Sequence, residues 1–182
     1  MKKKTIALIL SLILIVGGVI GGSIAWLTDK TNAVTNTFTV GDINIDLTET
    51  TGPTYKMVPG NEITKDPKVT VNAGSEDCWL FVKVEESASL DSYISYTVDS
   101  SKWTALPGVD GVYYCEVAAS SANQDFPVLT GNKVTVKGDV TKTMMEALNA
   151  SGATQPTLTF TAYAVQKANF ATPGAAWAEA NK

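Results

Sequence analysis

The chain has 182 residues, of which 45% are hydrophobic and 18% are charged, which suits one globular domain with a sizeable core and excludes a disordered or collagen-like chain. Its positive charge comes from 14 lysines without any arginine, and histidine is absent. Without histidine there is no Ser-His-Asp or Cys-His couple and no imidazole ligand for zinc, and without arginine there is no bidentate fork for phosphate or base edges. We therefore expect no enzyme, no cofactor and no nucleic-acid partner.

The beginning of the chain has the features of an export signal, which is not part of the folded domain. Residues 2–4 are lysines, residues 6–16 are almost entirely Ile, Leu and Val, and a small-x-small pattern ends at Ala25. We predict that residues 1–25 are a signal peptide cut after Ala25, which leaves Trp26 as the new N-terminus. An uncleaved anchor is the alternative, because the uncharged run is just long enough, at roughly 20 residues, to span a bilayer. In both cases the rest of the chain lies outside the cell.

The mature chain, from Trp26 onward, is acidic. Loss of the three N-terminal lysines leaves 11 lysines against 18 carboxylates, a formal charge of −7. Such a surface does not attract nucleic acid or anionic lipid. The C-terminal residues form no hydrophobic tail, so we expect contact with the membrane only through the signal peptide. The protein is expected to be secreted, to the extracellular matrix or the cell surface.

Few side chains offer ligands for a metal. Cys78 and Cys115 leave the reducing cytosol, so one disulfide between them is possible, and two free thiols on buried strand faces are the alternative. Two cysteines without histidine do not make a metal site. Asp42, Asn44 and Asp46 alternate like calcium ligands, but the sixth position of the pattern is a leucine instead of glycine, which favours a solvated strand face. We expect no metal.

Apolar residues recur at every second position through most of the mature chain, which predicts mainly antiparallel β-structure. Ile43, Ile45 and Leu47 share one parity and are expected to face the core. The run 78–84 is apolar at both parities, as expected of a central strand covered on both faces. Further short strands are predicted at 63–71, 93–98, 111–117, 126–129, 133–136 and 157–166. Their spacing indicates a sandwich or barrel.

Two segments favour short helices within this all-β pattern. Four apolar residues fall at helical spacing and predict a helix packed against a sheet edge: Val140, Met144, Met145 and Leu148. Near the end of the chain, Thr172 and Pro173 match an N-cap followed by a first-turn proline, which predicts a helical turn over 175–180. We therefore predict a leader at 26–36 and a single β-sandwich domain at 37–182, preceded by the signal peptide helix.

Several stretches of the chain share a pattern with one protein family. They are GGSIAWLTD at 21–29, NTFTVGDI at 36–43, VPG at 58–60, Lys65, VNAGS at 71–75, FTAYAVQ at 160–166 and the Ala-Trp pair at 176–177. In these stretches the chain resembles the TasA and camelysin group, exported proteins of Gram-positive bacteria that are processed by the specialised signal peptidase SipW. The resemblance touches both ends of the mature chain.

This resemblance implies a jelly-roll-like sandwich and a role as a fibre subunit of biofilm matrix, with itself and a SipW-type signal peptidase as partners. In TasA-like fibres the N-terminal segment of one subunit adds as a strand to the next, so that unpaired backbone groups at a sheet edge are satisfied. Carried onto this sequence, the donor is the leader, with Trp26, Leu27, Ala33 and Val34 as candidate anchors. A flexible leader without this role is the alternative.

Two other functions stay open. A monomeric secreted binding module would use the loops of the same sandwich to hold a polysaccharide or a protein. Trp79, Trp103 and Trp177 could line a carbohydrate platform, although core packing is the simpler expectation for them. Camelysin-like members of the group imply a metallopeptidase, but zinc peptidases typically rely on histidine ligands, which this chain lacks. We expect no protease activity.

Overall fold

The computed structural model describes residues 41–52 and 54–182. The chain divides into two units, Met1–Thr39 and Val40–Lys182, and all described residues belong to the second unit. The predicted signal peptide, its cleavage site, the leader and the expected start of the domain at residue 37 therefore lie outside the described residues. Within those residues, no helix has the length and apolar character needed to cross a membrane.

The described residues form three antiparallel sheets. The first has the order β1 (Ile45–Thr48), β3 (Lys68–Val71) and β8 (Gln124–Pro127). The second has the order β2 (Glu62–Thr64), β9 (Lys133–Val136) and β5 (Ile94–Ser95). The third has the order β10 (Leu158–Gln166), β4 (Cys78–Glu86), β7 (Val112–Val117) and β6 (Thr104–Ala105).

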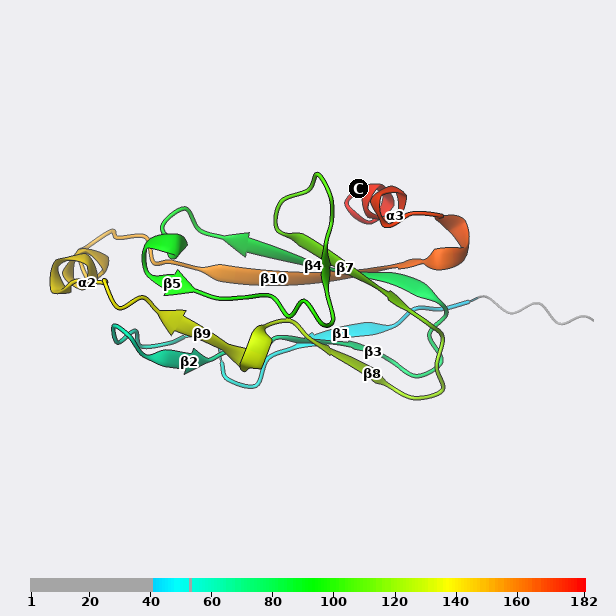
Figure 1. The fold of residues 1–182 in the computed structure, drawn as a ribbon, viewed down its shortest axis with the longest axis horizontal. Helices are drawn as coiled ribbons and strands as arrows, with labels where there is room; N and C mark the ends of the chain where they lie inside the picture. Colours follow the sequence, from blue (N-terminus) through cyan, green and yellow to red (C-terminus); the bar gives the residue numbers. More distant parts are fainter. Residues whose placement is uncertain (1–40, 53) are drawn as a thin grey trace, which may run out of the picture. The chain divides into compact units, whose positions relative to one another are not determined.

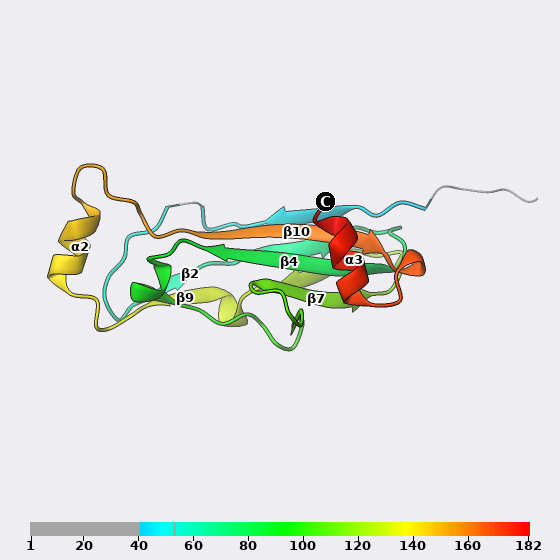
Figure 2. The ribbon, with the colours of Figure 1, turned by 90° about the horizontal axis from the view of Figure 1, so that it is seen from above.

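The first two sheets form one layer of a sandwich, and the third sheet forms the other (Figure 1). β3 follows β2 closely in the chain, and β9 follows β8 after a short 3-10 helix, η2 (Thr130–Asn132), so the two small sheets continue each other lengthwise. Figure 2 shows β1 and β10 side by side along one side of the sandwich. The main core lies between the layers and includes Val69, Val71, Leu80, Val82, Val134 and Val136.

β4 is the central strand predicted from its apolar residues at both parities, and the structure confirms this. Its inner face carries Leu80 and Val82 into the main core, and its outer face carries Trp79 and Phe81 into a second apolar cluster. That second cluster is covered by α3 (Pro173–Ala180), whose Trp177 ring lies 5.4 Å from the Phe81 ring, centroid to centroid. The sheet is therefore buried on both faces along β4.

Both predicted helices are present. In α3, the Thr172 hydroxyl accepts a hydrogen bond from the Ala175 N–H and Pro173 occupies the first turn, as expected of this cap. α2 (Lys142–Leu148) begins after Thr141, whose hydroxyl accepts from the Met144 N–H at 3.2 Å. Its apolar residues Met144, Met145 and Leu148 pack against the main core. Two further 3-10 turns are η1 (Leu90–Ser92) and η3 (Lys167–Asn169).

The all-β class with antiparallel sheets is confirmed, but one strand differs from its prediction. Ile43 and Ile45 pack against the core, whereas Leu47 keeps 38% of its surface exposed. Among the described residues, β1 is an edge strand that pairs with β3 alone and ends at Thr48, which leaves Leu47 partly open on its free side. The strand predicted over 93–98 is also shorter, because only Ile94–Ser95 joins β9, with one isolated bridge between Val98 and Leu129.

Candidate functional site

One side of the sandwich is bordered by two strand edges, those of β1 and β10, that have no strand partner among residues 41–52 and 54–182. The Thr157 carbonyl accepts from the Ser87 N–H at 2.9 Å, and the Lys167 N–H donates to the Asp77 carbonyl at 2.9 Å, so odd-numbered residues of β10 point their peptide groups toward β4. The even-numbered residues from Leu158 to Gln166 therefore point theirs outward. Among the described residues no backbone hydrogen bond reaches this outward edge.

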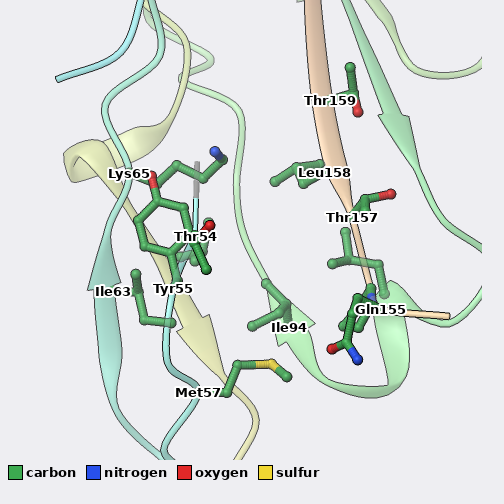
Figure 3. Close-up of a pocket in the computed structure, with 13 residues that line it drawn as sticks. Thr54, Tyr55, Met57, Ile63, Lys65, Ile94, Gln155, Thr157, Leu158 and Thr159 are labelled. Carbon is green, nitrogen blue, oxygen red and sulfur yellow. The ribbon is translucent and has the colours of Figure 1, made fainter. Parts of the chain in front are cut away.

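A cavity of about 500 Å³ opens on this side of the sandwich, where β1 has ended. Figure 3 shows Tyr55, Met57 and Ile63 on one wall, and Gln155, Thr157 and Leu158 on the opposite wall at the start of β10. The residues that line it also include Leu90, Ile94 and Val134, which belong to the buried core. The cavity is thus a part of the space between the layers that the described part of the chain leaves unfilled.

A buried amine lies at the rim of the cavity. Lys65 is only 8% exposed, and its Nζ lies 2.9 Å and 3.0 Å from the two carboxylate oxygens of Glu49. The same Nζ lies 5.2 Å from the centre of the Tyr55 ring and 5.5 Å from the centre of the Phe160 ring. A buried ammonium needs such partners, because without them its desolvation is costly.

Hydroxyl groups extend this pair into a network at the surface. The Tyr55 hydroxyl donates to Glu49 and lies 2.8 Å from the Thr51 hydroxyl, which also lies 3.2 Å from an Asp66 carboxylate oxygen. Burial, followed by the hydrogen bond to Glu49, raises the pKa of Tyr55. Hydrogen bonding from the Thr50 side chain lowers the pKa of Asp66. The raised pKa of Tyr55 keeps its phenol neutral at neutral pH, and the lowered pKa of Asp66 keeps its carboxylate charged.

The geometry of this arrangement is suited to binding an extended chain. The cavity wall combines apolar side chains with outward peptide groups of β10, and the buried Lys65 amine is paired with Glu49. Over residues 41–52 and 54–182, no group of three or more Cys, Asp or Glu side chains is placed to hold a metal ion.

The sequence-predicted assembly residues cannot be located at this site, because Ala25, Trp26, Leu27, Ala33 and Val34 lie outside the described residues. The structure does locate the other candidates. The alternating polar residues near β1 are exposed, and two of their carboxylates accept from amide side chains: Asp42 from Asn44 and Asp46 from Asn72, each at 2.9 Å.

The tryptophans expected either in a carbohydrate platform or in the core are buried. Trp79, Trp103 and Trp177 are 7%, 3% and 6% exposed. The Trp79 and Trp103 indole N–H groups donate to the backbone carbonyls of Phe170 and Pro127, at 3.0 Å and 2.9 Å. Their rings therefore pack in the core and do not form an exposed platform.

The two cysteines are free thiols in the structure, so the possible disulfide is not formed there. Cys78 lies opposite Val117 and Cys115 lies opposite Leu80, and both side chains join the main core. They are diagonal neighbours on one face, a relationship that separates Cβ atoms by roughly 7 Å. A disulfide needs Cβ atoms about 4 Å apart. The register of β4 and β7 therefore explains why Cys78 and Cys115 do not form a disulfide.

The residues around the cavity were not predicted as a site. Lys65 was noted only because it belongs to the pattern shared with the TasA and camelysin group. For Glu49, Tyr55 and Leu158 the sequence predicted no role in a binding site. Their roles depend on the order of strands, which brings β10 beside segments far away in the sequence. The one available signal was the lysine itself, a charge two residues after the apolar Ile63 in a strand-like stretch.

Comparisons with known proteins found no relative of this chain. No protein-family model matches the chain, and neither the search of curated proteins nor the search of solved structures found a match.

Proposed function

We propose that the mature chain is a secreted structural protein whose copies assemble into fibres by donor-strand addition, as in the TasA-like biofilm matrix proteins that its sequence resembles. The proposal includes export through residues 1–25, cleavage after Ala25 by a SipW-type signal peptidase, and a jelly-roll-like arrangement of the sandwich. The chain acts in the extracellular matrix or at the cell surface.

The observation that supports assembly is the unpaired edge of β10 beside an unfilled part of the core. An added strand would satisfy the outward peptide groups of β10 and place alternate side chains in the 500 Å³ cavity. The two large hydrophobic side chains that are exposed among the described residues, Leu47 and Val58, belong to β1 and to the segment before β2, and both segments border this side.

The leader is a suitable donor for this edge. Residues 26–36 are long enough to pair along all nine residues of β10. Alternate residues of a strand face the same side, so Trp26 and Val34 share one face of the donor, Leu27 and Ala33 share the other, and one of these pairs turns toward the cavity. The segment contains one acidic and one basic residue, so it brings little net charge to the groove. The partner of this chain is then a second copy of itself.

Electron microscopy of negatively stained protein tests the proposal. Residues 26–182 should form filaments, and a version that starts at Thr37 should remain monomeric at the same concentration. Val34→Asp should prevent filaments by placing a charge at an anchor, whereas Thr35→Asp, the same charge one residue away, should have a weaker effect. Folded monomers of every version, without filaments even at high concentration, would contradict strand addition.

The same cavity supports a second function, a monomeric binding module. Its volume lies in the range of small-ligand pockets, and its wall combines apolar side chains with Tyr55 and Gln155. A ligand-dependent rise in melting temperature without filament formation would favour this function. A metallopeptidase is the least supported function, because the chain has no histidine and its described carboxylates do not converge on a metal site.

A further inference from the structure

We propose that residues 54–58 form a strap that occupies the strand position beside β2, lines the cavity with Tyr55 and Met57, and must be displaced before a donor strand paired with β10 can enter that cavity. The contacts of Tyr55 with Glu49, Thr51 and Lys65 act as its latch. This inference rests on the proposed function and concerns its regulation: the latch sets how quickly a monomer accepts a donor.

In the part of the chain that the structure describes, no strand pairs with the outer edge of β2. The Val136 N–H donates to the Asn61 carbonyl and the Lys65 N–H donates to the Asn132 carbonyl, both at 2.9 Å. Odd-numbered residues of this stretch therefore bond toward β9, and the peptide groups of Glu62 and Thr64 point to the opposite side. β1 fills the equivalent position beside β3 but ends at Thr48.

The strap resembles a strand that has been inserted without being paired. Its exposure alternates with a period of two: Tyr55 and Met57 are half-buried and line the cavity, and Thr54, Lys56 and Val58 are exposed. Figure 3 shows the Tyr55 and Met57 side chains on the same wall as Ile63 of β2. The one backbone hydrogen bond found between the strap and the stretch that carries β2 is the turn contact from Asn61 N–H to the Val58 carbonyl, at 3.0 Å.

Side-chain contacts hold the strap in position, whereas a paired strand would be held by backbone hydrogen bonds. The Tyr55 hydroxyl reaches Glu49 and Thr51, and its ring lies against the buried Lys65 ammonium. Glu49 keeps about a quarter of its side chain exposed, so solvent screens its pair with Lys65 and limits the strength of the latch. A donor strand that forms a continuous hydrogen-bond ladder with the outward edge of β10 can therefore displace the strap from the cavity.

Trypsin measures the opening of the strap directly, because Lys56 is exposed at its centre and the next lysine, Lys65, is buried. Tyr55→Phe keeps the ring but removes the hydroxyl contacts. We expect cleavage after Lys56 to accelerate by roughly two- to tenfold, as expected for the loss of one ordinary hydrogen bond near the surface. Cleavage after the exposed Lys102, in a distant loop, should not change.

Tyr96→Phe is the matched control. The Tyr96 hydroxyl also donates to a glutamate, Glu86, but Tyr96 neither belongs to the strap nor lines the cavity. This variant should cleave after Lys56 at the wild-type rate. If both phenylalanine variants accelerate cleavage equally, the effect is a general loss of stability, and the latch is refuted.

Filament growth of residues 26–182 then tests the consequence. Tyr55→Phe should shorten the lag before filaments appear by a similar factor, Tyr96→Phe should not, and Tyr55→Phe in the version starting at Thr37 should still form none. Faster cleavage with an unchanged lag would overturn the strap as a barrier while leaving fibre assembly intact. Failure of all versions to form filaments, even at high concentration, would refute the proposed function and this inference with it.

Discussion

Strands β4 and β10 are both nine residues long and pair with each other along their whole length, yet their surroundings differ. β4 has β7 on its second edge, and Cys78, Leu80, Phe81 and Val82 are completely buried. Every residue of β10 keeps some exposed surface, and its second edge has no strand partner among the described residues. Two strands of the same sheet thus have different roles: one holds the fold together, and the other retains capacity for a partner.

The largest expected effect comes from truncating an aromatic side chain on each strand. Phe81 lies in contact with the rings of Tyr114 and Trp177, and Phe81→Ala should lower the free energy of unfolding by about 3 to 5 kcal/mol. Phe160 is half-buried, so Phe160→Ala should cost roughly 1 to 2 kcal/mol. Urea unfolding followed by tryptophan fluorescence measures both, and equal losses would show that β10 is as well packed as β4.

Proline substitutions compare the two edges of β10 itself. Tyr163→Pro removes an N–H that points toward β4 and should cost about 3 kcal/mol or more. Ala162→Pro removes an N–H that points outward, so it should cost roughly 1 kcal/mol and yet prevent filament growth. Thermal unfolding of the two variants checks the difference. Equal destabilisation would indicate that the outward edge is already paired in the monomer.

A smaller effect is expected from the thiols on β4 and β7. Burial raises the pKa of Cys78 to about 11 and of Cys115 to about 12, with smaller contributions from Asp77 and from Cys78 respectively. The unfolded chain loses these protons near pH 9, so the stability that they contribute is complete below that pH and is lost as pH rises toward 11 to 12. The loss at pH 10 should be on the order of 1 to 2 kcal/mol for each thiol.

The matching control is the double variant Cys78→Ala, Cys115→Ala. Its unfolding free energy should be lower at pH 7 because of the cavities it creates, but should fall less steeply between pH 9 and pH 11 than that of the wild type. Identical slopes for the two proteins would contradict the burial of the thiols.

Local sequence patterns predicted the elements that depend on neighbouring residues or have the same apolar environment on both faces. The run 78–84 predicted a central strand because both of its faces are apolar. Thr172 and Pro173 predicted α3 because a helix cap is a short-range interaction. Leu47 was wrongly expected in the core because alternation does not reveal that β1 is an edge. The cavity was unpredictable for the same reason: Lys65 and Leu158 meet only through the strand order.

The direction of β10 has a consequence for the polarity of any polymer. Its first residue, Leu158, lines the cavity, and its last, Gln166, lies against Gly41, the first described residue after the leader. The cavity and the beginning of the described domain therefore lie at opposite ends of the same strand. A donor that enters the cavity of the next copy makes a heterologous contact, which propagates head to tail when the two copies do not exchange donors reciprocally. A filament built in this way has two chemically different tips, one with an empty cavity and one with a free leader, and should grow at different rates from each.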